Sequence, residues 1–343
     1  MKKGLISTVV LNWNNKNVIE ACLDSLISQT YPHHEILVVD NGSQDGSLEL
    51  IKLKYSSKLQ IVENSRNLGF AEGVNIGIKH SQGEFIALLN SDAVVRDNWL
   101  EELLKGISRS ESIGMAASKI YFAGKENILD NTGAVISRDG LGMGRGRLEK
   151  DVGQYDSCEE VLCPSGCAAL YRRQMLEEAG GFDQHFFAYG EDLDIGLRGR
   201  LLGWRSVYVP AAVVYHKLSS STGLVSPLKA YYVERNRLWV LLKCFPLPHL
   251  LVSPYYTFRR YFYILYGMLS GKGPASSYLK RSSALSLLFI LIKAYFSTLY
   301  FLPYLIGQRI KLQRKRKVTS KEFGEWLKIY GINEKQAALN ELA

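Results

Sequence analysis

Short apolar segments alternate with segments of helical spacing over the first 95 residues, and this alternation restricts the chain to a small set of folds. The predicted strands are residues 6–11, 35–39, 59–62 and 85–89, and the predicted helices are residues 19–27, 47–55 and 70–80. Strands joined by helices form right-handed crossovers, which give a mostly parallel sheet covered on both faces. The sequence therefore predicts an α/β fold with a mostly parallel central sheet.

Polar residues follow the predicted strands. Ligands of such sheets bind beyond the carboxyl ends of the strands, so these residues are candidates for a binding site. They are Asn12, Asp40, Asn41, Ser43, Asn90, Ser91 and Asp92.

The segment after the second strand has two interpretations. Asp40 can accept hydrogen bonds from a base or a ribose, and the backbone amides of residues 41–43 can turn toward a ligand. Alternatively, the Asn, Gly and Ser residues only form the turn and cap the next helix. The sequence favours ligand binding at Asp40 and leaves both interpretations open for Asn41 and Ser43.

Residues 66–77 form a second polar and glycine-containing segment. Arg66 and Asn67 are candidates to face the pocket, while Gly73 and Gly77 predict close packing of the helix that contains them. The segment is not a dinucleotide-binding fingerprint, because the glycines of that motif follow the first strand.

Three acidic residues, Glu191, Asp192 and Asp194, follow an aromatic segment at residues 186–189. They are candidates for acid–base chemistry at the rim of a pocket. The structural alternative is acidic enrichment in a first helical turn. Asp194 also has the spacing to pair with Arg198 along a helix that begins near Glu191.

These motifs, taken in order, resemble those of family 2 glycosyltransferases of the Rossmann-like GT-A fold, with the greatest similarity to the bacterial rhamnosyltransferase-like branch. The resemblance covers residues 5–222, and the matching segments are residues 9–14, 38–43, 67–71, 90–92 and 191–192. It implies a catalytic domain at residues 1–222, with a nucleotide-binding half at about 1–110 and an acceptor half at about 111–222. It also implies an inverting enzyme that moves a sugar from a nucleotide-diphosphate donor to a glycan or lipid-linked acceptor.

The resemblance further implies a divalent metal ion, Mg²⁺ or Mn²⁺, that stabilises the leaving diphosphate. The family holds it with an Asp-x-Asp motif, but Asn90 occupies the first position here, which leaves Asp92 as the carboxylate. Asn90 can still ligate through its carbonyl oxygen or bind the sugar. His216 resembles a histidine that is a further metal ligand in some relatives, although a single histidine can also be structural.

By the same resemblance, Asp192 is the base that deprotonates the acceptor hydroxyl. Glu191 would orient Asp192 or contact the acceptor. The resemblance favours dTDP-rhamnose as donor, although UDP- and GDP-linked sugars use the same scaffold, and a lipid-linked precursor of cell wall, O-antigen or capsule as acceptor. The alternative is a degenerate scaffold that binds a nucleotide or glycan without turnover.

Two segments before residue 170 bear on the donor site. Residues 140–146 are so rich in glycine that we expect a mobile loop, which either closes over the donor phosphates with Arg145 or Arg147 or is only a disordered connection. Residues 164–169 lead into a strand that is expected to border the donor site.

Charge separates the C-terminal third from the rest of the chain. The net charge is +9, yet residues 235–321 contain sixteen Lys or Arg and no Asp or Glu, so residues 1–234 have a net charge of −5. We expect residues 223–343 to be helical, basic and rich in aromatic residues. Lys293 and Pro303 interrupt the apolar run that begins at residue 284, which leaves no stretch of about 20 apolar residues to span a membrane.

A polybasic run at residues 308–317 follows these apolar helices, a combination that favours docking on an anionic membrane surface. The alternatives are a homo-oligomer interface and packing on the catalytic domain. Nucleic acid is not an expected partner, because no nucleic-acid-binding module is present. The predicted location is the cytoplasm, peripheral on the inner face of the cell membrane.

Five cysteines, at 22, 158, 163, 167 and 244, have no regular spacing, which disfavours a disulfide framework and fits a reducing compartment. The apolar run near the N-terminus breaks at Asn12 after only seven residues, so a first strand is a better interpretation than a signal peptide.

Overall fold

The computed structural model of this chain describes residues 1–157, 159–217, 226–279 and 283–339. The chain divides into two compact units. The N-terminal unit comprises Met1–Ala134, Gly144–Arg200 and Trp204–Ser221, and the C-terminal unit comprises Val135–Met143, Leu201–Gly203 and Thr222–Ala343. Cys158 and the predicted domain boundary at residue 222 lie outside the described residues.

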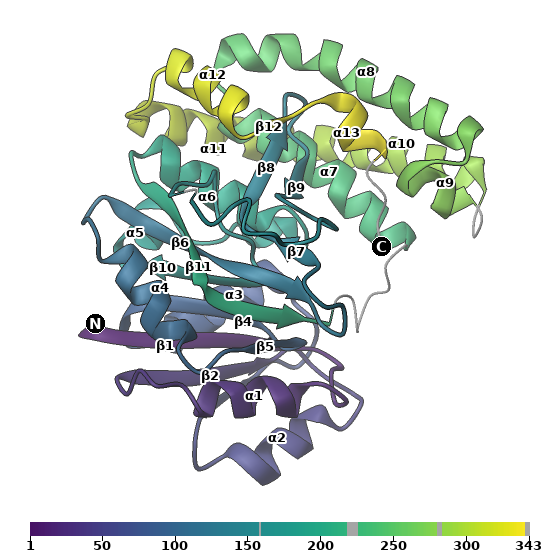
Figure 1. The fold of residues 1–343 in the computed structure, drawn as a ribbon. Helices are drawn as coiled ribbons and strands as arrows, with labels where there is room; N and C mark the ends of the chain where they lie inside the picture. The colour runs from purple at the N-terminus through teal and green to yellow at the C-terminus, as the bar shows by residue number, and fades with distance from the viewer. Residues whose placement is uncertain (158, 218–225, 280–282, 340–343) are drawn as a thin grey trace. The chain divides into compact units, whose positions relative to one another are not determined.

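A mixed β-sheet is the centre of the N-terminal unit (Figure 1). Its strands are β1 (Lys2–Asn12), β2 (His34–Asp40), β3 (Gln60–Glu63), β4 (Gly83–Asn90), β5 (Ala93–Val95), β6 (Ile113–Phe122), β7 (Leu129–Asn131), β10 (Ala168–Arg172) and β11 (Arg205–His216). Their order is β3-β2-β1-β4-β10-β6-β11-β5, with β7 paired to β6. The first four strands are parallel as predicted, whereas β10 is antiparallel to both of its neighbours.

Helices cover both faces of this sheet, as predicted. They are α1 (Ile19–Ile27), α2 (Ser47–Tyr55), α3 (Phe70–His80), α4 (Trp99–Ile107), α5 (Arg173–Ala179) and α6 (Glu191–Leu201). Side chains alternate along β1, so Ile6 and Val10 share one core with α1 and α4, while Val9 faces α3. A Cβ atom at Gly77 would lie 2.4 Å from Cγ1 of Val9. Glycine therefore permits the close packing of α3 that the sequence predicted.

The C-terminal unit is built mainly of helices. They are α7 (Pro227–Cys244), α8 (Leu247–Ser270), α9 (Gly273–Leu279), α10 (Ala284–Tyr300), α11 (Leu302–Lys315), α12 (Ser320–Ile329) and α13 (Glu334–Leu339). Helix α7 packs against α10 and α11, and α8 packs against α13. No helix among the described residues is by itself long and apolar enough to cross a membrane; α10 and α11 meet that criterion only together, with a bend of 62° between them.

The expectation of a mobile loop at residues 140–146 is wrong for residues 142–144, which form β9 (Gly142–Gly144). This strand belongs to a small sheet with β8 (Ala134–Ser137) and β12 (Gly331–Ile332). A tight turn joins β8 to β9, in which Ser137 N–H donates to the Leu141 carbonyl at 2.9 Å. Gly140 permits this turn because its φ is +84° and a Cβ there would lie 2.6 Å from Leu241 Cγ. Glycine is thus required by a fixed turn.

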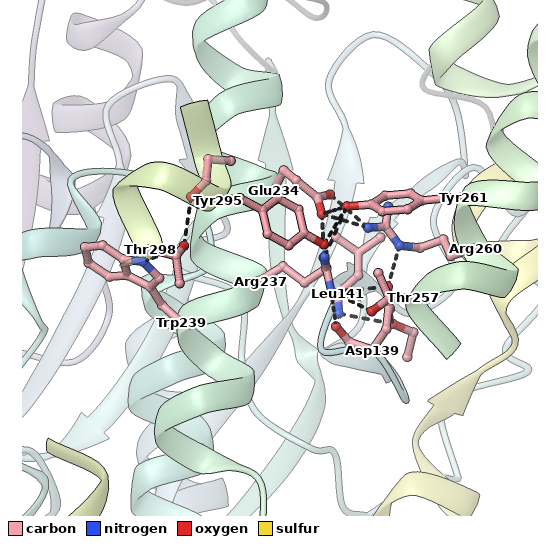
Figure 2. A network of polar contacts seen from close by, with 12 residues as sticks. Asp139, Leu141, Glu234, Arg237, Trp239, Thr257, Arg260, Tyr261, Tyr295 and Thr298 are labelled. Carbon is pink, nitrogen blue, oxygen red and sulfur yellow. Dashed lines mark hydrogen bonds and ion pairs between the residues drawn. The ribbon is translucent and has the colours of Figure 1, made fainter. Parts of the chain in front are cut away.

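A buried ionic network surrounds Asp139 at the tip of this hairpin (Figure 2). Arg260 Nε donates to Asp139 Oδ2 at 2.5 Å, and its Nη2 donates to Glu234 Oε2 at 2.8 Å. Arg237 Nη1 donates to the Asp139 carbonyl at 2.7 Å, and its Nε donates to Glu234 Oε1 at 3.0 Å. Tyr261 O–H donates to Glu234 Oε1 at 2.5 Å. Two carboxylates and two guanidiniums therefore balance in charge, and they connect the β8–β9 hairpin to α7 and α8.

The guanidiniums determine the protonation of both carboxylates. Burial by itself raises the pKa of Asp139, but Arg260 and Arg237 more than offset this effect and hold that pKa below its ordinary value. The pKa of Glu234 is likewise lowered by Arg237 and Arg260 despite burial. Because both pKa values are depressed in the folded state, their contribution to stability is present above the unfolded-state values of about 4 and is lost as the pH falls through the folded-state values.

We predict that Asp139→Asn destabilises the C-terminal unit by about 3–5 kcal/mol, because it leaves buried guanidinium charge unpaired. Calorimetric unfolding at neutral pH would measure the loss. Glu325→Gln is the matched control, since Glu325 forms an exposed ion pair with Lys328 in the same unit and its loss should leave stability nearly unchanged. Equal effects of the two substitutions would contradict the prediction.

Candidate active site

The carboxyl ends of three neighbouring strands bring the polar residues together. Asn12 lies directly beside Asp40 in the pairing of β1 with β2, and Leu11 lies beside Asn90 in the pairing of β1 with β4. The predicted convergence of the strand ends is therefore present at one edge of the sheet.

Asp40 organises the turn that follows β2. It is only 1% exposed; Oδ1 accepts a hydrogen bond from Asn12 Nδ2 at 2.8 Å, and Oδ2 accepts from the backbone amides of Gly42 at 3.1 Å and Ser43 at 2.9 Å. The Ser43 hydroxyl in turn accepts from Asn12 Nδ2 at 3.1 Å. The contacts of Asp40 within the protein are thus those of a turn-forming residue, and its role in ligand binding stays a prediction.

Asn41 connects this turn to the segment before α3. Its buried Nδ2 donates to Asn67 Oδ1 at 3.0 Å and to the Gly69 carbonyl at 3.1 Å, and its Oδ1 accepts from the Leu68 amide at 3.2 Å. Arg66, in contrast, is exposed. Asn41 therefore fixes the backbone that presents Arg66 and Asn67.

The aromatic segment before Glu191 closes against the start of α3. The Phe70 amide donates to the Phe187 carbonyl at 2.5 Å, and Gly69 has no Cβ, which would otherwise lie 2.6 Å from that oxygen. Phe187 itself has φ +65° and ψ −65°, and the Ala188 amide donates to the Phe186 carbonyl at 2.8 Å. This is a γ-turn with positive φ, a strained conformation that persists only where surrounding contacts hold it.

Gly166 and Cys167, consecutive residues of one loop, connect the motif at residues 90–92 to the motif at residues 191–194. The Gly166 amide donates to Asp192 Oδ2 at 2.9 Å, and the next carbonyl, that of Cys167, accepts from the Asn90 amide at 2.8 Å. Asp192 Oδ1 accepts from the Leu193 amide at 2.8 Å. Motifs about a hundred residues apart in sequence are therefore neighbours in the fold.

Hydrogen bonds distinguish the two adjacent acids, because burial raises the pKa of both. Glu191 is 6% exposed, and its Oε2 makes no hydrogen bond among the described residues. Burial, with smaller effects from Asp192 and Asp194, raises the pKa of Glu191 to about 8, so this carboxyl retains its proton at neutral pH. Burial also raises the pKa of Asp192, but the amides of Gly166 and Leu193 oppose that rise by stabilising the carboxylate.

Asp194 forms the structural ion pair with Arg198 that its position in the sequence predicted. Its Oδ2 lies 2.6 Å from Arg198 Nη2, and both side chains are almost fully buried. The predicted pair along a helix beginning at Glu191 is confirmed.

His216 lies between two carboxylates. Strand β11 pairs antiparallel with β5 so that His216 is opposite Ala93, which places its Nε2 3.2 Å from Oδ1 of Asp92. Its Nδ1 lies 2.8 Å from Oδ2 of Asp130 in β7. Burial lowers the pKa of His216, but Cys167, Asp130 and Asp92 raise it more, so the net shift is upward.

Asp130 was not among the residues singled out from the sequence. It lies in a three-residue strand with no recognisable motif around it, and only the pairing of β7 with β6 brings it to His216. Among the described residues, no group of three or more His, Cys, Asp or Glu side chains is arranged to hold a metal ion.

Arg145 and Arg147, the two candidates to bind the donor phosphates, interact with other groups of the protein. Arg147 forms an ion pair with Asp130, and Arg145 Nη2 donates to the Thr132 carbonyl at 2.8 Å. The Arg145 guanidinium also lies over the rings of Tyr155 and Tyr208, at 4.9 and 5.2 Å from their centroids.

Ser91, a further candidate for donor binding, is buried and accepts a hydrogen bond from Asn15 Nδ2 at 2.8 Å.

Comparison with known proteins identifies the class. Residues 7–180, just over half of the chain, match the profile of Glycosyl transferase family 2, and the chain belongs to this family. The crystal structure of GalNAc-T7 with UDP, GalNAc and Mn²⁺ has a similar fold, with a TM-score of 0.55 and 19% identity over 69% of this chain and 47% of that one. The fold is therefore of the GT-A type, as predicted, with an additional helical C-terminal region.

Two relatives indicate the setting in which such domains occur. The chain is 29% identical to N-acetylglucosaminyl-diphospho-decaprenol L-rhamnosyltransferase of Mycobacterium tuberculosis, over 64% of this chain and 78% of that protein. It is 27% identical to the O-antigen biosynthesis protein RfbC of Myxococcus xanthus, over 63% of this chain. The chain spans only 17% of the length of the Myxococcus protein.

Proposed function

We propose that this chain is an inverting glycosyltransferase of bacterial cell-surface polysaccharide synthesis, which moves rhamnose from dTDP-rhamnose to a glycan or lipid-linked acceptor. The observation that carries the proposal is the loop at residues 166–167, which connects Asp192 to Asn90 through two hydrogen bonds. The similarity to a mycobacterial rhamnosyltransferase supports the choice of sugar and of acceptor class.

Asp192 is the proposed base. Two backbone amides stabilise its carboxylate form, whereas Glu191 retains its proton at neutral pH and cannot accept another. Two adjacent acids whose carboxylate forms are stabilised to different extents are suited to different roles. Asp192 takes the proton of the acceptor hydroxyl as that oxygen attacks the anomeric carbon from the face opposite the leaving diphosphate, which inverts the configuration. Because Glu191 is protonated, no second negative charge lies beside Asp192. Glu191 orients Asp192 or contacts the acceptor.

Asp92 and His216 are the proposed protein ligands of a divalent cation, Mg²⁺ or Mn²⁺, with the Asn90 carbonyl oxygen as a third. When two ligand atoms each lie about 2.1 Å from one ion and the angle between them at the ion is about 90°, the two atoms are about 3 Å apart. The distance of 3.2 Å between Asp92 Oδ1 and His216 Nε2 fits that geometry. The bound cation would supply positive charge to the departing diphosphate. Asp92 and His216 hold their positions through the pairing of β5 with β11.

The nucleotide would bind at the carboxyl ends of β1, β2 and β4. In this proposal Asn12, Asp40 and Asn41 shape the binding edge by fixing two loops, and Ser43, Arg66, Asn67 and Ser91 line it. The exposed Arg66 guanidinium can pair with the negatively charged diphosphate of the donor.

We predict that Asp192→Asn lowers transfer by about 10²- to 10⁴-fold, the range for loss of a general base, and leaves nucleotide affinity almost unchanged. Turnover and calorimetric nucleotide titration would separate these effects. Glu191→Gln is the matched comparison, because an amide mimics a protonated carboxyl, and it should lose far less turnover. Near-normal turnover in Asp192→Asn would remove Asp192 from the base role.

A thermal-shift panel of dTDP, UDP, GDP and ADP, with and without Mn²⁺ or Mg²⁺, tests the donor class, because a ligand selective for the folded state raises its stability. We expect the largest metal-dependent shift with dTDP. A larger shift with UDP or GDP would correct the sugar nucleotide. A folded protein that binds a nucleotide but never transfers a sugar would favour the alternative function, a degenerate scaffold.

We further propose that the C-terminal unit docks this enzyme on the inner face of the cell membrane. Helix α8 exposes an apolar stripe at intervals of three and four residues: Leu251, Tyr255, Phe258, Phe262, Leu265 and Leu269. Helix α10 exposes a second, broader apolar face: Leu285, Leu288, Phe289, Ile292, Phe296, Leu299 and Tyr300. The hydroxyls of Tyr261 and Tyr295 lie 3.2 Å apart, so the two helices are neighbours.

The charge of this unit supports an anionic bilayer as the partner. Residues 235–321 contain no carboxylate, and α11 ends in exposed basic residues that include Lys311, Arg314 and Lys315. Apolar side chains that enter the interface and cations that meet anionic headgroups are the two requirements of an interfacial helix.

We predict that the protein sediments with phosphatidylcholine vesicles only when they contain phosphatidylglycerol, and that added salt releases it. Phe258→Glu should weaken this binding because it places a carboxylate in the α8 stripe. Leu53→Glu is the matched control, because Leu53 is an equally exposed apolar residue on α2. If Phe258→Glu instead changes the molar mass in solution and leaves vesicle binding intact, the stripe is an oligomer interface.

A further inference from the structure

We infer that Asp130 is a positioning residue for the metal site: it fixes the His216 ring so that Nε2 presents its lone pair to a cation shared with Asp92. This inference rests on the proposed metal role of Asp92 and His216. Its basis is geometric, since Asp130 Oδ2 lies 2.8 Å from Nδ1 and Asp92 Oδ1 lies 3.2 Å from Nε2 of the same ring.

The hydrogen-bonding capacity of each group determines where the proton resides. An ionised carboxylate only accepts hydrogen bonds, and a neutral imidazole has one N–H and one lone pair. Asp130 Oδ2 therefore accepts a hydrogen bond from an N–H on Nδ1 of His216, which leaves Nε2 as the nitrogen that ligates a cation after losing its proton. A cation that binds between Nε2 and Asp92 Oδ1 would take the place of that proton.

Asp130 is rigid enough to orient the ring. Arg147 pairs with its other carboxylate oxygen, and the Arg147 guanidinium lies 5.1 Å from the centroid of Phe122. Hydrogen bonds from the Leu129 amide to the Glu149 carbonyl at 2.9 Å and from the Leu148 amide to the Leu129 carbonyl at 2.8 Å hold the backbone next to Asp130.

The histidine is fixed independently of Asp130. Its backbone is paired with Phe122 in β6 and with Ala93 in β5. With both backbones fixed, the side-chain contact between Asp130 and His216 controls the orientation of the ring. A carboxylate that accepts from the second nitrogen of a ligating histidine is a common arrangement in metalloproteins, and it also increases the basicity of the ligand.

The competing explanation is that Asp130 only joins β7 to β11 as a structural contact. That role would change the free energy of unfolding but not the metal affinity of protein that is folded. In Asp130→Asn the side-chain amide can donate to Nδ1, which would move the ring proton to Nε2 and block ligation. Metal affinity therefore distinguishes the two explanations.

The experiment measures free Mn²⁺ by electron paramagnetic resonance in titrations of the folded full chain with dTDP present. We expect Asp130→Asn to weaken Mn²⁺ binding by about 10- to 100-fold, the usual effect of losing such a partner. Asp151→Asn is the matched control, because Asp151 is a similarly buried carboxylate that pairs with Lys119, and its affinity for Mn²⁺ should equal that of the wild type. Unchanged affinity in folded Asp130→Asn overturns the inference.

Two further measurements keep the inference separate from the proposed metal site. Asp92→Asn and His216→Ala should both weaken Mn²⁺ binding; if they do and Asp130→Asn does not, only the role of Asp130 fails. If neither weakens it, the metal assignment of the proposed function fails as well. In case Asp130→Asn does not fold, ¹⁵N spectra of the wild-type histidines with saturating Mg²⁺ and dTDP provide the test: a proton on Nδ1 of His216 supports the inference, and a proton on Nε2 overturns it.

Discussion

The antiparallel insertion of β10 between β4 and β6 is the arrangement on which the candidate site depends. Residues 166 and 167 at its start donate a hydrogen bond to Asp192 and accept one from Asn90. Because β10 is paired on both edges, this loop cannot shift without breaking the sheet. The proposed base and the proposed metal-binding motif therefore keep a fixed separation, as an in-line displacement requires.

Two buried glutamates illustrate how neighbouring groups determine what a carboxyl can do. Glu234 lies among two guanidiniums and a tyrosine hydroxyl, and its pKa is lowered. Among the described residues, Oε2 of Glu191 makes no hydrogen bond, and the pKa of Glu191 is raised to about 8. A lowered pKa among paired charges, as at Glu234, is typical of a stabilising network. A raised pKa at a buried carboxyl, as at Glu191, is typical of functional sites. Burial is common to both, so the partners account for the difference.

The division of charge along the chain is consistent with two tasks in two units. The N-terminal unit contains most of the family 2 match and the acidic site, whereas the unit that includes residues 235–321 is basic and exposes apolar helices. A lipid-linked acceptor would be presented at a membrane surface, so docking through the basic unit and transfer by the acidic one are compatible. The two proposals are nevertheless independent, because each rests on residues of one unit alone.

The sequence by itself determined four strands and three helices of the first 90 residues, because hydrophobic periodicity is a local property, and helices α2 and α3 have the predicted bounds. It did not predict the three-residue strand β5. It also placed Asn12, Asp40 and Asn90 at one edge of the sheet, since parallel strands align their carboxyl ends. Tertiary structure alone decided that Asp40 accepts hydrogen bonds from Asn12 and from its own turn, that Asp130 lies beside His216, and that residues 142–144 form a strand. The physical reason is that the contacts of Asp40 with Asn12 and of Asp130 with His216 join different strands, which no local pattern of residues encodes. The β8–β9 hairpin is local, but a glycine-rich segment by itself does not distinguish a tight turn between strands from a mobile loop.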